Sequence, residues 1–295
     1  MLSKCFVQFD SIFYAVGIGV LPDERRKQGE EVATQKEDSM KKLFAVLLLA
    51  CMTLSLVACG REKVAVNGPD DLENALTGVQ LGTTGDIYVS DFGEDHIERF
   101  NKGYEAVQAL LQGKVDAVVI DDQPAKTFVA ENKGLKILDE EFALEEYAIA
   151  INKENTQLKD DINAALKEIK ANGTFDRIVD YYIGQEQDTP AYTPKDVDRS
   201  NGTLVMATNA EFPPYEYREG DKITGLDVDM MLAVCDILGM ELKIEDMQFD
   251  SIIASVISGK ADVGVAGLTV TEDRLKSVDF SDTYYTGKQV IIVAE

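Results

Sequence analysis

The side chains that could carry chemistry in this 295-residue chain are carboxylates, hydroxyls and arginines, because histidine and cysteine are scarce. The single histidine, His96, lies among charged residues in GEDHIERF, a setting typical of a surface position. The four cysteines lack the C-x-x-C spacing of metal or redox sites: Cys5, Cys51, Cys59 and Cys235. These counts argue against histidine-dependent hydrolases and against a Cys/His zinc site, and we expect no metal or other cofactor.

Several polar residues do follow apolar runs in a way that suggests a binding site. The guanidinium of Arg274, in TVTEDR, can donate two parallel hydrogen bonds to a carboxylate, although a surface ion pair is the alternative. Asp121 ends the apolar run AVVID, and Asp122 is the adjacent alternative. The strand expected at 79–81 is followed by the turn 82–85, Gly-Thr-Thr-Gly, a common turn sequence. If a helix begins near Asp86, its free N–H groups favour an anion.

Composition limits the class of protein. With 45% hydrophobic and 28% charged residues, the chain is typical of a soluble globular protein with one large domain or two modest ones. The net charge of −24 argues against a nucleic-acid partner and slightly favours steering of cationic solutes.

The segment from Met40 to Gly60, MKKLFAVLLLACMTLSLVACG, is typical of a secretory signal. It also resembles a bacterial lipobox, in which the cysteine, here Cys59, is lipidated and becomes the mature N-terminus. A transmembrane helix is the alternative, but the apolar run is short. We therefore interpret 40–58 as a lipoprotein signal peptide and 1–39 as a non-native leader, whose translation the sequence leaves open. The resemblance implies an exported protein anchored by lipid to the outer face of the bacterial cell membrane.

The remaining chain alternates short β-rich runs with helical patterns, which predicts an α/β fold with largely parallel sheets. Strands are expected at 117–120, 135–138 and 290–293, and 184–201 has the composition of a linker. Two stretches on either side of that linker have similar sequences, AVQALLQGKVDAVV and SIIASVISGKADVGV. Each has an apolar helical pattern, then Gly-Lys, then an aspartate that begins a β-rich run. Two similar α/β units indicate two lobes with a cleft between them.

Five motifs carry a specific resemblance: TLVMATNAEFPPYEY, ITGLDVDMMLAVCDILGMEL, FDSIIASVISGKADVGVAGLTVTEDRLKSVDFSDTYY, GVQLGTTGD and GKVDAVVIDDQPA. They are similar to the amino-acid-binding extracellular solute-binding proteins, family 3, of ABC importers, over about 66–183 and 203–295. The resemblance implies a two-lobed periplasmic-binding-protein-like fold (type II), with two mixed α/β lobes, a hinge and a cleft.

The order of the motifs departs from that family, because the GTTG motif precedes the TLVMATN motif. We interpret the chain as circularly permuted, with Glu295 continuing naturally into Lys63; a chimera of truncated tandem copies or a misassembled gene is the alternative. The predicted parts are a GTTG lobe at 63–147, a return segment with helices on the other lobe at 148–183, a linker at 184–201 and the other lobe at 202–295. One crossing between lobes, near 145–151, should be covalent and the other cut between Glu295 and Lys63.

The resemblance also implies the roles of site residues. Arg274 would bind the ligand carboxylate, Asp121 the ammonium and Thr269 both poles, while Phe212 and Phe249 would flank the ligand side chain. The full set of ligand-binding positions is Asn209, Phe212, Phe249, Gly267, Thr269, Arg274, Thr83, Thr84, Gly85 and Asp121.

The expected function is capture of a polar L-amino acid (glutamine, arginine, lysine or cystine) for an ABC permease, by a monomer. Related proteins carry serine at the position of Ala266, so the choice of amino acid, like the permease, stays open. A dehydratase-like enzyme on the same scaffold is an alternative that would need a positioned acid or base, for which Glu211 is the candidate. A ligand-sensing module is a further alternative.

Overall fold

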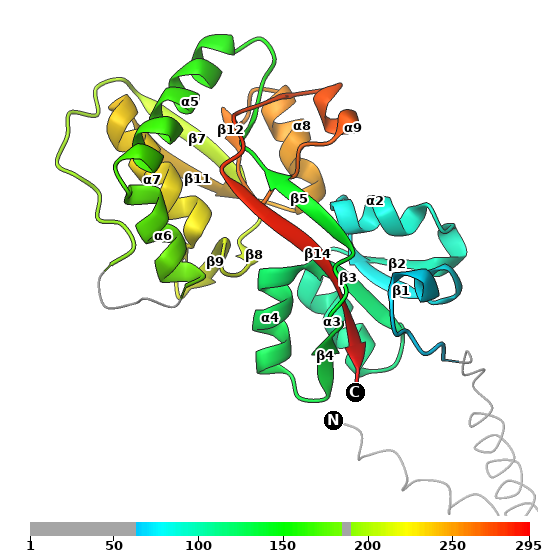
Figure 1. Ribbon diagram of the computed structural model, residues 1–295. Coiled ribbons are helices and arrows are strands. Elements are labelled where there is room, and N and C mark those ends of the chain that lie inside the picture. The colour runs from blue at the N-terminus through cyan, green and yellow to red at the C-terminus, as the bar shows by residue number, and fades with distance from the viewer. Residues whose placement is uncertain (1–62, 185–189) are drawn as a thin grey trace, which may run out of the picture. The chain divides into compact units, whose positions relative to one another are not determined.

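The computed structural model describes residues 63–184 and 190–295. The predictions for 1–39, 40–58 and Cys59 lie outside the described residues. Within these residues the strands form two main sheets and one small sheet, and helices pack against the main sheets (Figure 1). This arrangement confirms the predicted α/β fold, but the expectation of largely parallel sheets was wrong, because both main sheets mix parallel and antiparallel pairs. The described residues include no helix that is both long and apolar enough to cross a membrane.

We call the first sheet and its helices the GTTG lobe. Its strand order is β2-β1-β3-β14-β4, with β5 also pairing with β14. β1 is parallel to β2 and β3, whereas β14 is antiparallel to β3, β4 and β5, so the sheet is mixed. The elements are β1 (Thr77–Gln80), α2 (Thr84–Ser90), β2 (Ile97–Phe100), α3 (Gly103–Leu111), β3 (Ala117–Asp121), α4 (Asp122–Glu131), β4 (Leu135–Ile137), β5 (Ala143–Tyr147) and β14 (Tyr285–Ala294), with short 3-10 turns at Pro69–Asn74 and Glu94–His96.

We call the second main sheet and its helices the Arg274 lobe. Its strand order is β11-β7-β12-β6-β13, and a small sheet β10-β9-β8 lies beside it. β7, β11 and β12 are parallel, and β6 is antiparallel to its neighbours. The elements are β6 (Ala150–Ile151), α5 (Thr156–Ala171), α6 (Thr174–Tyr182), β7 (Thr203–Thr208), β8 (Glu211–Phe212), β9 (Glu216–Glu219), β10 (Lys222–Thr224), α7 (Leu226–Leu238), β11 (Glu241–Asp246), η3 (Phe249–Ser251), α8 (Ile252–Ile257), β12 (Val263–Gly264), α9 (Glu272–Leu275) and β13 (Asp279–Phe280).

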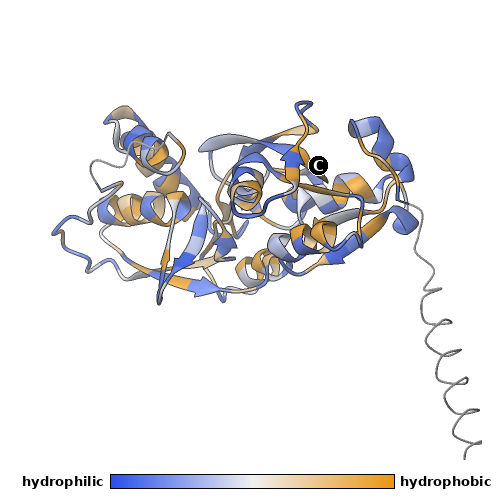
Figure 2. Cartoon of the chain, turned by 90° about the horizontal axis from the view of Figure 1, so that it is seen from below, coloured by the Kyte–Doolittle hydropathy of each residue, from blue (hydrophilic) through white to orange (hydrophobic). Residues whose placement is uncertain are grey.

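The apolar pattern explains why these segments fold as they do. Every residue of β3 is buried, as expected for a continuous apolar run in the middle of a sheet. On α5 the buried residues recur at helical spacing: Ile162, Ala165, Leu166 and Ile169. Figure 2 shows a mixture of hydrophobic and hydrophilic residues along the helices.

Two strands connect the lobes, and the expectation that one crossing is cut was wrong. β14 runs beside β5 from the Arg274 lobe into the GTTG lobe (Figure 1), pairing with β5 over Tyr285–Gln289 and with β3 over Gln289–Val293. Both crossings are therefore covalent. The segment 202–295 was predicted to form one lobe, but its last strand, β14, belongs to the sheet of the GTTG lobe.

The part of the predicted linker that the structure describes follows the surface of α7. Asp236, on α7, accepts hydrogen bonds from the Tyr192 hydroxyl at 2.5 Å and from the backbone N–H of Lys195 at 2.6 Å. It also pairs with Arg199 at 2.5 Å. These contacts fix residues 192–199 to the Arg274 lobe.

Candidate functional site

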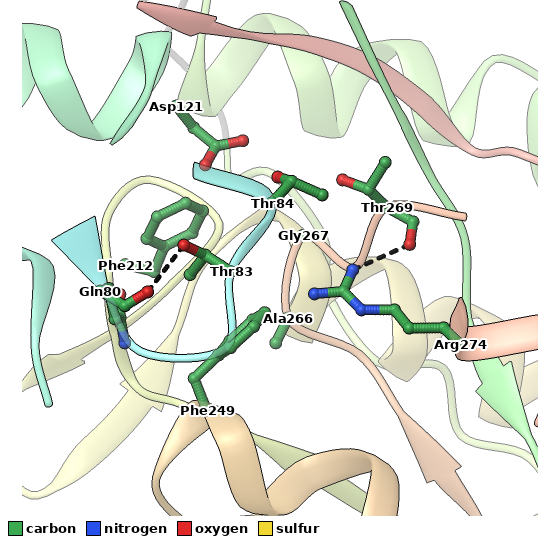
Figure 3. A pocket seen from close by; sticks show the side chains of 10 residues that line it. All are labelled: Gln80, Thr83, Thr84, Asp121, Phe212, Phe249, Ala266, Gly267, Thr269 and Arg274. Carbon is green, nitrogen blue, oxygen red and sulfur yellow. Dashed lines mark hydrogen bonds between the residues drawn. The ribbon is translucent and has the colours of Figure 1, made fainter. Parts of the chain in front are cut away.

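A small cavity lies between the two lobes (Figure 3). In this view Asp121, Thr84 and Thr269 lie along one side, and the ring of Phe249 lies on the opposite side. The lining residues are Gln80, Thr83, Thr84, Asp121, Phe212, Phe249, Ala266, Gly267, Thr269 and Arg274. The first four come from the GTTG lobe and the other six from the Arg274 lobe.

The Arg274 guanidinium reaches the cavity from α9. Its Nη1 donates to the carbonyl oxygen of Thr269 at 2.8 Å, and its Nη2 donates to the carbonyl oxygen of Gly82 at 3.0 Å. Among the described residues no carboxylate forms an ion pair with it, and the guanidinium lies over the Phe249 ring, 5.6 Å from its centroid. Burial lowers the pKa of Arg274, and the nearby charges of Glu145 and Asp121 oppose that shift. The site therefore presents a partly desolvated cation to the cavity.

Asp121 supplies the opposite charge from the end of β3. It is 6% exposed, accepts a short hydrogen bond from the Tyr147 hydroxyl and accepts another from Gln289 Nε2 at 2.8 Å. Burial raises the pKa of Asp121 to about 7, and the Glu145 charge adds to the rise while the two hydrogen bonds oppose it. Asp122, the alternative, instead pairs with Lys126 at 2.8 Å and does not line the cavity.

A backbone turn shapes the floor of the cavity at Gly267. Its φ of +53° lies in the left-handed region, and an added Cβ would lie 3.2 Å from the Phe212 ring, so glycine suits both the conformation and the space. Its N–H donates to Asp227 Oδ2 at 3.0 Å, and that oxygen also accepts the Tyr284 hydroxyl at 3.0 Å. Asp227 thus holds the turn from beneath the cavity.

Two polar contacts join the lobes near Phe212. Gln80 Nε2 donates to Asn209 Oδ1 at 2.9 Å, and both side chains are buried. Lys102 pairs with Glu211 at 2.5 Å, with both side chains about one-third exposed. Neither Asn209 nor Glu211 lines the cavity.

The structure brings most of the predicted site residues together. Asn209 lies one contact away, behind Gln80, and Gly85 packs against β3, where an added Cβ would lie 3.1 Å from the Val119 carbonyl oxygen. Sequence reasoning missed Gln80 and the buried Glu145 and Gln289 behind the cavity. Gln80 could have been found, because it ends β1 two residues before the Gly-Thr-Thr-Gly turn begins. The sequence around Glu145 and Gln289 contains no comparable pattern.

The fold and this cavity define a two-lobed α/β binding protein, with a cleft that carries a cationic group from one lobe and an acidic group from the other. The chain belongs to the bacterial extracellular solute-binding proteins, family 3, whose sequence profile matches residues 26–185 and 204–295. The described residues contain no cluster of acidic, histidine and cysteine side chains that could hold a metal ion.

Individual relatives match shorter stretches. The arginine-binding extracellular protein ArtP of Bacillus subtilis is 43% identical over 30% of this chain and 35% of its own length. The L-cystine-binding protein TcyA of the same organism is 33% identical over 32% of this chain and 35% of its own length. A solved arginine-bound form of truncated ArgBP from T. maritima is 44% identical over 30% of this chain and 42% of that chain, with a TM-score of 0.29. This chain therefore spans less than half the length of these three proteins.

Proposed function

We propose that this protein captures a polar L-α-amino acid outside the cell and delivers it to an ABC importer. The observation that carries the proposal is the placement of Arg274 and Asp121, which present opposite charges to one cavity from opposite lobes. A free amino acid carries a carboxylate and an ammonium on one carbon, and both lose water when they enter a cleft. Charge-assisted hydrogen bonds to fixed partners compensate for that loss. The printed functions of the relatives, arginine and cystine binding, support an amino-acid ligand.

Arginine and other cationic amino acids are the first ligands to test. The Phe212 and Phe249 rings line the cavity, and a cationic side chain gains energy over an aromatic face. The net charge of −24 also raises the local concentration of cations. The predicted glutamine, lysine and cystine belong in the same panel. A thermal-shift panel of the twenty amino acids with cystine and ornithine tests the proposal, which fails if none of them stabilises the protein.

We propose further that lipidation of Cys59 anchors the protein as a monomer to the outer face of the membrane and so keeps it beside its permease. The sequence pattern around Cys59 supports this part. Detergent partitioning of wild type and Cys59→Ala, expressed with the native signal, tests it: only the wild type should enter the detergent phase. Mass spectrometry of the mature N-terminus would show whether a lipid is attached.

The dehydratase-like alternative differs from binding in the fate of the ligand. A binding protein returns its ligand unchanged, whereas an enzyme converts it. Prolonged incubation of the protein with each amino acid that binds, followed by mass spectrometry of the small molecules, separates the two. Recovery of the unchanged ligand is the result we expect.

A further inference from the structure

Glu145 is a buried carboxylate directly behind the cavity. It lies on β5 and has no exposed surface. Its Oε2 accepts hydrogen bonds from the hydroxyls of Thr84, at 2.9 Å, and of Thr269, at short range. Thr84 belongs to the GTTG lobe and Thr269 to the Arg274 lobe, and both line the cavity. One carboxylate oxygen therefore holds a hydroxyl from each lobe.

These two bonds determine what the hydroxyls can offer a ligand. A threonine hydroxyl has one hydrogen to donate and two lone pairs to accept with. Because both hydrogens are directed at Glu145, the Thr84 and Thr269 oxygens can only accept hydrogen bonds on the cavity side. Gln289 Nε2 donates to Thr84 at 3.3 Å and so takes one of its lone pairs, which leaves one free.

The surroundings of Glu145 act on its pKa in opposite directions. Burial raises the pKa of Glu145, while the hydroxyls of Thr269, Thr84 and Tyr88 and the charge of Arg274 oppose the rise. The other acid nearby is Asp121, whose own pKa the Glu145 charge helps to raise. A ligand cation bound between Asp121 and the two threonines would face acceptors only.

We infer that Glu145 is a positioning residue that commits the Thr84 and Thr269 hydroxyls to accept hydrogen bonds, and thereby makes this side of the cavity select a protonated amine. An ammonium has three N–H donors, and Asp121, Thr84 and Thr269 offer three acceptor groups. A 2-hydroxy acid of the same skeleton has one O–H donor at that position and leaves two acceptors without partners. The inference rests on the proposed function and deepens it, since it identifies the group that separates amino acids from 2-hydroxy acids.

Glu145→Gln is the direct test, because glutamine keeps the shape but can donate from its amide nitrogen. The two hydroxyls could then turn and donate into the cavity. Glu146→Gln is the matched control, since Glu146 is the adjacent residue of the same type on β5 and its side chain is exposed. Wild type and both variants are titrated calorimetrically at about pH 8 with L-arginine, L-glutamine and the corresponding 2-hydroxy acids. Glu145→Gln should lower the preference for the amino acid over its 2-hydroxy analogue roughly tenfold or more, and Glu146→Gln should leave it unchanged.

A second pair of variants covers the case in which Glu145→Gln does not fold. Thr84→Val and Thr269→Val each remove one acceptor with little change of shape, and each should lower the same preference. Combining Thr269→Val with Glu145→Gln should add less than the sum of the two effects, because Glu145 acts through that hydroxyl. Folded variants that keep the wild-type preference would overturn the inference alone. A wild type that binds no amino acid would instead defeat the proposed function.

Discussion

Arg274 and Gly82 are 192 positions apart, yet Nη2 of the arginine donates to the glycine carbonyl at 3.0 Å. Arg274 comes from one lobe and Gly82 from the other, so the guanidinium that faces the cavity also joins the lobes. Its second nitrogen, Nη1, is held by the Thr269 carbonyl. A ligand carboxylate that enters here meets a guanidinium that the protein has already oriented, which reduces the entropy lost on binding.

Replacing Arg274 should therefore weaken binding strongly. Loss of one partner of a buried charged contact typically costs about 2–5 kcal/mol, so Arg274→Ala should lower affinity by roughly thirtyfold or more. Arg274→Lys keeps the charge but not the planar pair of donors, and should recover part of the loss. Calorimetry with the best ligand of the panel measures both. Arg177→Ala is the control, because Arg177 is exposed on α6 and does not line the cavity. Equal affinities for Arg274→Ala and Arg177→Ala would mean that Arg274 does not bind the ligand.

The two polar contacts between the lobes near Phe212 should contribute unequally. The Lys102–Glu211 pair is partly exposed and screened by salt, so Lys102→Ala should lower ligand affinity by less than about threefold, and less still in high salt. Gln80→Ala should cost more, about 1–3 kcal/mol, because it leaves the buried Asn209 oxygen without its partner. Titrations in low and high salt compare them. A larger effect from Lys102→Ala than from Gln80→Ala would contradict this ranking of the two contacts.

Much of this site follows from patterns that the sequence displays. The apolar run before Asp121 forms the fully buried β3, so the aspartate lies at the carboxyl end of an interior strand of the sheet. The turn 82–85 follows a strand, and the helix begins at Thr84, two residues before the expected Asp86. The roles of Arg274 and Thr269 could be predicted only from the family resemblance, because an arginine that follows acidic residues can also form an ion pair at the surface.

Glu145 could not be predicted, because β5 reverses the usual pattern. Leu144 is 70% exposed and Glu145 is fully buried, although the hydrophobicity of the two side chains alone would bury the leucine. At Glu145 the inner face of β5 meets the hydroxyls of Thr84 and Thr269, so a carboxylate suits that position. Similarly, the apolar residues 290–293 predicted only the second half of β14. The first residues of this strand, which cross between the lobes, contain no apolar run.

Ligand affinity should rise with pH between about 5.5 and 8. The pKa of Asp121 is about 7 in the ligand-free protein, so below that pH the aspartic acid must lose a proton before it can pair with an ammonium. At about pH 5.5 this linkage should lower affinity by up to roughly thirtyfold relative to pH 8. Calorimetry across this range measures it, and Asp121→Asn should bind weakly with a flatter profile. A flat profile in the wild type would contradict the role given to Asp121.

The same shift affects the stability of the ligand-free protein in the opposite direction. A carboxyl whose pKa is higher folded than unfolded stabilises the fold while it is protonated, fully below its unfolded pKa of about 3.9, and loses that contribution as pH rises through about 7. Asp227, whose pKa burial raises to about 6, acts in the same sense. The free energy of unfolding of Asp121→Asn should therefore decrease less than that of wild type between about pH 5 and pH 8. Denaturant titrations at both pH values test this difference.

The order of the lobes along the chain should be exchangeable. Lys63 and Val64 line the same hollow as Val293 and Ala294, and Val66 packs in the same buried cluster as Val293. A chain that runs from 190 to 295, continues through about three glycines into 63, and ends at 184 keeps both crossings between the lobes. It also keeps the contacts of residues 192–199 with α7. Because the cavity lining is unchanged, we expect this rearranged protein to fold and to bind the same amino acid within a few-fold of wild type.

A second rearrangement provides the control for that experiment. A chain opened between Gly287 and Lys288, within β14, cuts one crossing where it pairs with β5. The two halves of β14 would then be held only by hydrogen bonds to their neighbours, so we expect lower stability and weaker binding than in the first rearrangement. Circular dichroism and calorimetry on the two proteins compare them directly. If the first rearranged chain folds no better than the second, the lobe order is a requirement of this fold, and its interpretation as a circular permutation is wrong.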